Sequence, residues 1–376
     1  MIKYVKIENW NKEKNMVDEQ KNPLAENLLG REINNKWKVI KKLEKSSDET
    51  GGMFSVGYEV IDNNKNIGFL KAFNFKEVFK HKDENMMQIL NIFSEAYNYE
   101  KEILEKCSQK KLKHIVNILD AGTITENGYM IPVPYLIFEM AERSLRNKLA
   151  EIDKKMDVIW NLNCIHQIAV ALQEIHNSDI AHLDLKPSNI LLFDEDFSKL
   201  TDFGRSSMKS SNIKVYYEKN GSVEGDRSYA PIERLYGYNE GDWYNIKIGT
   251  DFYLLGSFIF QIFTGFSITT AIMENIDKQF YWFNWHGEYA EVYSYIFEAY
   301  ILVMQKFQLI LKEQMDNDTA SEIVKLVNEM CTPDINRRGD PEAIKRKSER
   351  KYELYRYITR IDKMCKKLEI SLKRGV

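Results

Sequence analysis

Between residues 37 and 73 apolar side chains alternate with polar ones or cluster in short runs, which is typical of β-strands. The runs are WKVIKKLE, FSVGYEVID and NIGFLKAF, and residues 62–64 between the last two favour a turn. From about 84 to 107 apolar residues recur at helical spacing, and IVNILDAG and PYLIFEMA predict two more strands. The first part of the chain is therefore expected to be a small sheet with one long helix.

After residue 144 the pattern becomes helical. VIWNLNCIHQIAVALQEIHNS is amphipathic, and we expect further helices near 250–264, 288–315, 319–330 and 347–372. Strands first and helices second favour an α+β fold with a small antiparallel sheet lobe and a larger helical lobe. The expected parts are an N-terminal extension at 1–36, a sheet lobe at 37–140, a helical lobe at 141–342 and a basic helical tail at 343–376.

Composition narrows the class of protein. With 44% hydrophobic and 12% aromatic residues among 376, the chain can bury a sizeable core, and a net charge of -3 gives no general attraction to nucleic acid. The four cysteines are far apart, which favours free thiols in a reducing compartment over a zinc site or a disulfide framework. The N-terminus lacks the apolar core of a secretory signal, and the apolar stretches are too short for a membrane span. We expect a cytoplasmic protein.

The candidate chemistry lies in HLDLKPSN at 182–189 and TDFG at 201–204. Phosphoryl transfer needs a carboxylate that orients the attacking hydroxyl, oxygen ligands for Mg²⁺, and a cation near the charge that moves. Asp184 suits the first role and Lys186 the last, while Asn189 and Asp202 suit the metal.

His-x-Asp-x-Lys-x-x-Asn followed by Asp-Phe-Gly resembles the signature of the eukaryotic-like serine/threonine protein kinases. The resemblance covers about 37–340 and implies a two-lobed kinase fold, ATP and Mg²⁺ as cofactors, and a protein substrate with a serine or threonine acceptor. The composition, rich in Lys, Asn and Ile, favours a bacterial member.

The resemblance extends to the lysine that contacts the α- and β-phosphates. Lys71 ends the strand FLK and fills this position. Its ion-pair partner is expected on the following helix, where Glu100 fits best and Glu95 and Glu102 remain possible. Lys71, Asp184, Asn189 and Asp202 are then expected around one triphosphate.

By the same resemblance, YLIFEMA lines the adenine site. Phe138 is the gatekeeper, while the Glu139 carbonyl and the Ala141 N–H are expected to bond the adenine edge through the backbone. Leu191 is expected as the apolar floor beneath the ring.

The glycine-rich loop departs from the family. We align Gly52 to Ser55 with the loop tip and Gly57 with the valine that covers the adenine. Phe69 stands where the family has a small alanine. Our hypothesis is that Phe69 fills the space that Gly57 leaves, and the alternative is a distorted pocket that binds ATP poorly.

Three residues resemble structural positions of the family. Glu233 in YAPIE is expected to pair with Arg338, and Asp251 to brace the loop at 182–189 by bonding its backbone. These residues support the site without doing chemistry.

Two departures bear on regulation and substrate. Leu183 replaces the arginine that pairs with a phosphorylated activation segment, so phosphate between 205 and 227 is not expected to be the usual switch. Asp226 stands where a threonine is common, and a second carboxylate near Asp184 would raise one pKa or repel phosphate unless Lys186 or Arg227 compensates.

Partners are less clearly indicated. The segment 266–317 is rich in aromatic residues, with the run FYWFNW at 280–285 at its centre. Its aromatic side chains are expected in the core, with an exposed docking surface as the alternative. The basic tail is expected to pack on the body, and binding to an acidic partner is the second option. The oligomeric state is not indicated.

Three functional hypotheses remain. The favoured one is an active protein kinase, with autophosphorylation. The others are a pseudokinase scaffold and a small-molecule kinase or nucleotidyl transferase on the same fold. The full set of catalytic and structural residues favours the first.

Overall fold

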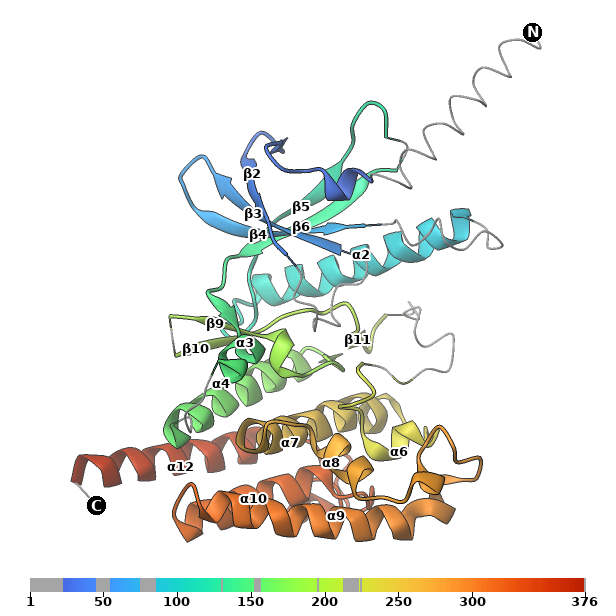
Figure 1. The fold of residues 1–376 in the computed structure, drawn as a ribbon, viewed down its shortest axis with the longest axis vertical. Coiled ribbons are helices and arrows are strands. Elements are labelled where there is room, and N and C mark those ends of the chain that lie inside the picture. Colours follow the sequence, from blue (N-terminus) through green and yellow to red (C-terminus); the bar gives the residue numbers. More distant parts are fainter. Residues whose placement is uncertain are drawn as a thin grey trace. The chain divides into compact units, whose positions relative to one another are not determined.

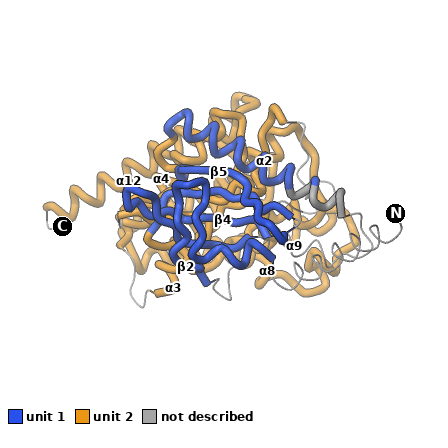
Figure 2. The backbone as a smooth tube through the Cα atoms, turned by 90° about the horizontal axis from the view of Figure 1, so that it is seen from above, with its two compact units in different colours: residues 1–111, 116–141 blue, residues 112–115, 142–376 orange. Residues whose placement is uncertain are grey.

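The computed structural model describes residues 23–44, 55–74, 86–129, 131–151, 157–194, 196–211, 223 and 225–374 (Figure 1). The chain divides into two compact units, and Figure 2 colours them separately. Unit 1 comprises Met1–Lys111 and Val116–Ala141, and unit 2 comprises Leu112–Ile115 and Glu142–Val376.

Unit 1 is a sheet with a long helix, α2 (Met86–Gln109), as the pattern predicted. Its described strands follow the order β1-β2-β3-β4-β6-β5, and every neighbouring pair is antiparallel. The strands are β1 (Glu32–Ile33), β2 (Trp37–Lys42), β3 (Ser55–Asp62), β4 (Ile67–Phe73), β5 (Ile118–Ile124) and β6 (Val133–Glu139).

The hairpin of β3 and β4 shows why these strands form. Tyr58 and Val60 lie on the buried face while their neighbours are partly exposed, as the period of a strand requires. At the turn, Asp62 Oδ1 accepts hydrogen bonds from the backbone N–H groups of Asn64 and Asn66, each at 2.8 Å. A short polar side chain thus closes the turn.

Residues before Trp37 also belong to the body of unit 1. The short helix η1 (Leu24–Glu26) is followed by a buried Leu28, and the Tyr58 hydroxyl donates a hydrogen bond to the Ala25 carbonyl at 2.8 Å. The segment that we treated as an extension therefore contributes to the core of this unit from about residue 24 onward.

Unit 2 is mainly helical (Figure 1). Its described helices are α3 (Leu145–Ala150), α4 (Val158–His176), α6 (Ile232–Leu235), α7 (Gly249–Thr264), α8 (Ile268–Glu274), α9 (Tyr289–Lys312), α10 (Asn317–Cys331), α11 (Pro341–Lys345) and α12 (Tyr355–Arg374). The short helices η3 (Pro187–Asn189), η4 (Tyr244–Ile248) and η5 (Lys278–Phe280) complete the set. Short strands are β7 (Arg143–Ser144), β8 (Ile180–Ala181), β9 (Ile190–Phe193), β10 (Phe197–Leu200) and β11 (Ser207–Met208).

Helix α7 forms the centre of unit 2. Together with η4 it is the one stretch of the described chain, Tyr244–Thr264, with the length and hydropathy of a membrane span, and 94% of that apolar window is buried. A β-carbon on Gly256 would lie 2.5 Å from Cys331 Sγ, so α7 and α10 touch closely here. Burial of this kind is what a core helix shows.

The basic tail forms α12, which packs on α4 as predicted. Its inner face buries Tyr357, Ile361 and Met364. Arg360 forms ion pairs with Glu322 and Glu329 of α10, both at 2.6 Å. Part of the positive charge of the tail is therefore neutralised within unit 2.

The prediction that the aromatic residues of 266–317 lie in the core is confirmed for Tyr289, Tyr300 and Phe307 but wrong for the run at 280–285. Phe283 is 57% exposed, and the other rings of the run are half-buried. Phe280 stacks on Tyr295 at 3.8 Å between ring centroids, and Tyr295 is itself 45% exposed. Phe280 lies in the connection before α9 and Tyr295 lies in α9, and the two rings cover each other on the surface of unit 2.

Candidate active site

Asp251 of α7 holds the start of the loop at 182–189 through hydrogen bonds to its backbone. Asp251 accepts backbone hydrogen bonds from His182 and Leu183, both at 2.7 Å, and its Oδ2 lies 2.8 Å from His176 Nε2. The Asp251 side chain is fully buried. This confirms the expected brace and explains how Leu183 keeps a left-handed φ of 66°.

Asp184 is the carboxylate of the loop, and it is buried. Its Oδ2 lies 3.2 Å from Lys186 Nζ and accepts a hydrogen bond from Asn189 Nδ2 at 3.0 Å. Burial raises the pKa of Asp184, and Asp202 adds to the effect, while Lys186 and Arg205 oppose it. Lys186 and Asn189 thus fix the orientation of the Asp184 carboxylate. A group that accepts a proton from a substrate has to be oriented in this way.

Asn189 and Asp202 offer oxygen atoms of the kind that Mg²⁺ prefers. The side-chain NH₂ of Asn189 donates two hydrogen bonds to Asp184, one to the backbone oxygen at 2.8 Å and one to Oδ2. The side-chain oxygen, Asn189 Oδ1, lies 3.5 Å from Ser188 Oγ. The Thr201 N–H donates to the Asn189 carbonyl at 3.0 Å, so the residue directly before Asp202 is bonded to Asn189. The donor set therefore fits a magnesium ion whose remaining ligands are phosphate and water.

The described residues hold no group of three or more His, Cys, Asp or Glu placed for a metal ion. An amide and a single carboxylate do not form such a group. Mg²⁺ sites that include substrate phosphates commonly use only one or two protein ligands of this kind.

In unit 1, Lys71 of β4 forms an ion pair with Glu100 of α2. Lys71 Nζ lies 2.8 Å from Oε1 and 3.0 Å from Oε2 of Glu100. Glu100 is 3% exposed, whereas Glu95 accepts a hydrogen bond from Asn91 on the surface of the helix. Among the three candidate glutamates the structure pairs Glu100 with Lys71. That Lys71 acts on the same triphosphate as Asp184 stays a prediction.

The predicted adenine-contacting residues fall on two strands and a connection. Phe138 is buried near the end of β6, the Glu139 carboxylate accepts a hydrogen bond from the Asn117 N–H at 2.7 Å, and Ala141 follows the strand. Leu191 lies on β9 in unit 2. Their contacts with adenine remain predictions.

Of the two predicted loop residues, Gly52 lies outside the described residues, and Ser55 is the first residue of β3. Further along β3, a β-carbon built on Gly57 would be 2.9 Å from Phe69 Cε2 and 3.3 Å from Phe69 Cζ. The Phe69 ring therefore occupies the space that Gly57 leaves, and the packing part of our hypothesis is confirmed.

Asp226 is a second carboxylate near Asp184, and positive groups around it offset the repulsion between the two. Its Oδ2 lies 3.8 Å from Lys186 Nζ, and its N–H donates to Asp184 Oδ1 at 3.2 Å. Burial acts to raise the pKa of Asp226, but hydrogen bonds from Ser228, together with Lys186 and Arg205, lower it overall. Lys186 and Arg205 compensate the charge; we had expected Lys186 or Arg227.

Sequence reasoning missed Arg205 and Gly225. Arg205 Nη1 donates to the Gly225 carbonyl at 2.5 Å, and its Nε lies 4.0 Å from Asp184 Oδ2. An arginine directly after Asp-Phe-Gly was the available signal, because that position borders the predicted metal ligand Asp202.

Arg338 and Glu233 form the expected buried pair. Two hydrogen bonds, one from each terminal nitrogen of Arg338 to a different carboxylate oxygen of Glu233, join them at 2.5 and 2.8 Å, and Arg338 also donates to the Thr332 carbonyl at 2.9 Å. Burial alone would lower the pKa of Arg338, but Glu233 raises it above its ordinary value. The pair anchors α6 to the chain that follows α10.

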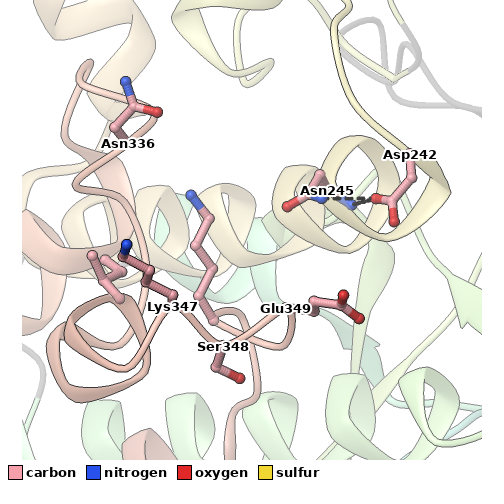
Figure 3. Close-up of a pocket in the computed structure, with 8 residues that line it drawn as sticks. Asp242, Asn245, Asn336, Lys347, Ser348 and Glu349 are labelled. Atoms are coloured by element: carbon pink, nitrogen blue, oxygen red, sulfur yellow. Dashed lines mark hydrogen bonds between the residues drawn. The ribbon is translucent and has the colours of Figure 1, made fainter.

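Unit 2 also has a surface hollow of about 410 Å³, shown in Figure 3. Asp242 and Asn245 on one side are joined by a hydrogen bond of 2.8 Å, and Lys347, Ser348 and Glu349 form the other side. None of the residues predicted for the active site lines this hollow. Its mixed charges indicate no single ligand class.

Comparison with known proteins agrees with this geometry. The family described as protein kinase domain matches residues 50–348. The serine/threonine-protein kinase SBK1 of Danio rerio is 34% identical over 104 residues, 27% of this chain and 25% of the relative. A probable serine/threonine-protein kinase of Clostridium acetobutylicum is 32% identical over 152 residues, 40% of this chain and 21% of the relative. The probable serine/threonine-protein kinase PknB of Corynebacterium glutamicum is 25% identical over 213 residues, which cover 56% of this chain and 28% of the relative. The similarity thus spans less than a third of the length of each relative.

Proposed function

The chain belongs to the protein kinase family, and on this premise we propose that it transfers the γ-phosphate of ATP, with Mg²⁺, to serine or threonine hydroxyls of protein substrates. The observation that carries the proposal is the held carboxylate of Asp184, with Lys186 Nζ at 3.2 Å and Asn189 Nδ2 at 3.0 Å. A carboxylate fixed in this way can orient a hydroxyl and accept its proton.

The remaining residues have distinct roles. Lys186 lies close enough to Asp184 to place positive charge where the phosphoryl group moves. Asn189 and Asp202 would hold Mg²⁺, which neutralises phosphate charge when bound. In unit 1, Lys71 would bind the α- and β-phosphates, and Glu100 fixes the direction of its ammonium group.

The alternatives explain less. A pseudokinase scaffold has no chemical use for Lys71, Asp184, Asn189 and Asp202 together. A small-molecule kinase or nucleotidyl transferase would not require the complete framework of Asp251 and the pair of Glu233 with Arg338. We further propose autophosphorylation and a cytoplasmic location, the latter supported by the four free cysteines, all buried.

The experiment is incubation of the full chain with labelled ATP, with and without Mg²⁺ and generic protein substrates, followed by phosphoamino acid analysis. We expect Mg²⁺-dependent phosphoserine or phosphothreonine on the chain itself and on substrate. Label found only in phosphotyrosine would overturn the substrate class. Label found only in a small molecule would favour the phosphotransferase alternative.

A further inference from the structure

The segment that begins after Gly204 is tied to the loop at 182–189 from its start. Ser207 and Met208 form β11, which pairs with β8 directly before this loop. The Ser206 hydroxyl also donates to the His182 carbonyl at 3.3 Å. The first residues of the segment therefore follow the loop closely.

The far end of the segment returns to the same loop at Gly225. Gly225 has a φ of +79°, and a β-carbon there would lie 2.5 Å from the Leu183 carbonyl oxygen and 3.3 Å from Asp184 Oδ1. The close approach requires a glycine both for its φ and for the space. The next residue, Asp226, donates its N–H to Asp184 Oδ1 at 3.2 Å.

Arg205 joins these parts through one guanidinium group. It donates to the Gly225 carbonyl at 2.5 Å, and its Nε lies 4.0 Å from Asp184 Oδ2. The side chain is 33% exposed, so solvent screens the attraction to Asp184 only in part. A charged donor makes the bond to Gly225 stronger than one between neutral groups.

Leu183 cannot supply a cation for this task. This apolar residue is 1% exposed, and its N–H donates a hydrogen bond to Asp251 Oδ1 at 2.7 Å. At the segment end, Lys186 Nζ lies 3.8 Å from the Asp226 carboxylate, whereas Arg205 contacts a backbone carbonyl, that of Gly225. A carbonyl is present in every molecule, whereas a phosphate has to be added.

We infer that Arg205 is a positioning residue that holds residues 225–230 against the loop at 182–189 in the unphosphorylated chain. Gly225 and Asp226 lie beside Asp184, the carboxylate proposed to orient the acceptor hydroxyl, so this contact keeps the end of the segment next to the place where a protein substrate would react. The inference rests on the proposed function for its effect on catalysis, but not for its effect on the structure.

The test compares three variants of the full chain, freed of phosphate by phosphatase treatment. Arg205→Met removes the charge and the donor at similar length, and Arg205→Lys keeps a positive donor. Lys209→Met is the matched control, because Lys209 is an exposed cation of the same segment. Amide hydrogen exchange of 225–230 is measured first, then KM for peptide and for ATP.

We expect exchange at 225–230 to be about tenfold faster in Arg205→Met, unchanged in Lys209→Met, and intermediate in Arg205→Lys. KM for peptide should rise about tenfold in Arg205→Met while KM for ATP stays within about twofold. If Arg205 only stabilised the fold, Arg205→Met would instead raise KM for both peptide and ATP, or would speed amide hydrogen exchange throughout unit 2.

Unchanged exchange in Arg205→Met would overturn the inference, whatever the activity. So would a fall of about tenfold in wild-type activity on phosphatase treatment, since the segment would then depend on phosphate. A wild type without phosphotransfer would sink the proposed function alone, because the exchange comparison needs no activity.

Discussion

The Phe69 ring packs directly against Gly57: a β-carbon built on Gly57 would lie only 2.9 Å from Phe69 Cε2. A small residue on β3 and a large one on β4 therefore share one space. Close packing penalises both an empty volume and an overlap, so the two positions should depend on each other.

We predict that Phe69→Ala weakens ATP binding several-fold, because it leaves a void next to Gly57. Gly57→Val alone should also be harmful, since its side chain would overlap the ring at 2.9 Å. The double variant should recover, with a coupling energy of about 0.5–3 kcal/mol. Calorimetric titration with ATP measures all four forms. Unchanged or tighter binding in Phe69→Ala would remove the compensation argument.

The pair of Lys71 and Glu100 gives a test of which glutamate matters. Glu100→Gln removes the charge that orients Lys71 Nζ at 2.8 Å, so kcat/KM for ATP should fall about tenfold or more. Glu95→Gln is the matched control on the same helix, because Glu95 bonds Asn91 on its surface. Equal losses in both variants would argue that the effect is one of helix stability.

The buried pair of Arg338 and Glu233 should govern stability rather than chemistry. Arg338→Met leaves the Glu233 carboxylate buried without its partner, and we expect a loss of about 3–5 kcal/mol in the free energy of unfolding. Arg337→Met is the control, because Arg337 is 81% exposed, and it should change stability by less than about 0.5 kcal/mol. Urea denaturation compares them. A small loss in Arg338→Met would show that the pair is dispensable.

The fall of kcat/KM at low pH should follow the protonation of the Asp184 carboxylate. This carboxylate must be ionised to accept a proton, and burial raises its pKa, so activity is lost as pH falls through a value above that of an ordinary aspartate. Arg205 lowers this pKa, so Arg205→Met should move the fall to higher pH. The ionisation of ATP is common to both proteins and cancels in the comparison of kcat/KM profiles. A shift to lower pH would contradict the assignment.

The residues that the motifs contain could be predicted well from the sequence. Asp251 and the pair of Glu233 with Arg338 lie where the motifs indicated, because each fills a fixed place in a local pattern. The order of strand and helix indicated that the partner of Lys71 lies on α2, and the resemblance to the kinase family favoured Glu100 over Glu95 and Glu102; the structure pairs Lys71 with Glu100.

Other features depend on the fold and were not predictable in the same way. Periodicity identifies apolar side chains but not whether they face a core or each other, which is why the exposed Phe283 was misassigned. The bond from Arg205 to Gly225 joins residues twenty positions apart, and no local sequence pattern indicates that these two positions meet. The buried Leu28 was hidden in a polar segment.

The central claim is that Asp184 performs phosphoryl transfer while other residues bind the nucleotide. The most direct measurement compares the rate of phosphate transfer and the Kd for ATP with Mg²⁺ in the wild type and in Asp184→Asn. Asparagine keeps the shape but cannot accept the proton, so we predict a rate at least about a hundredfold lower and a Kd within about threefold. Transfer at the wild-type rate in Asp184→Asn, or none in either protein, would contradict the account.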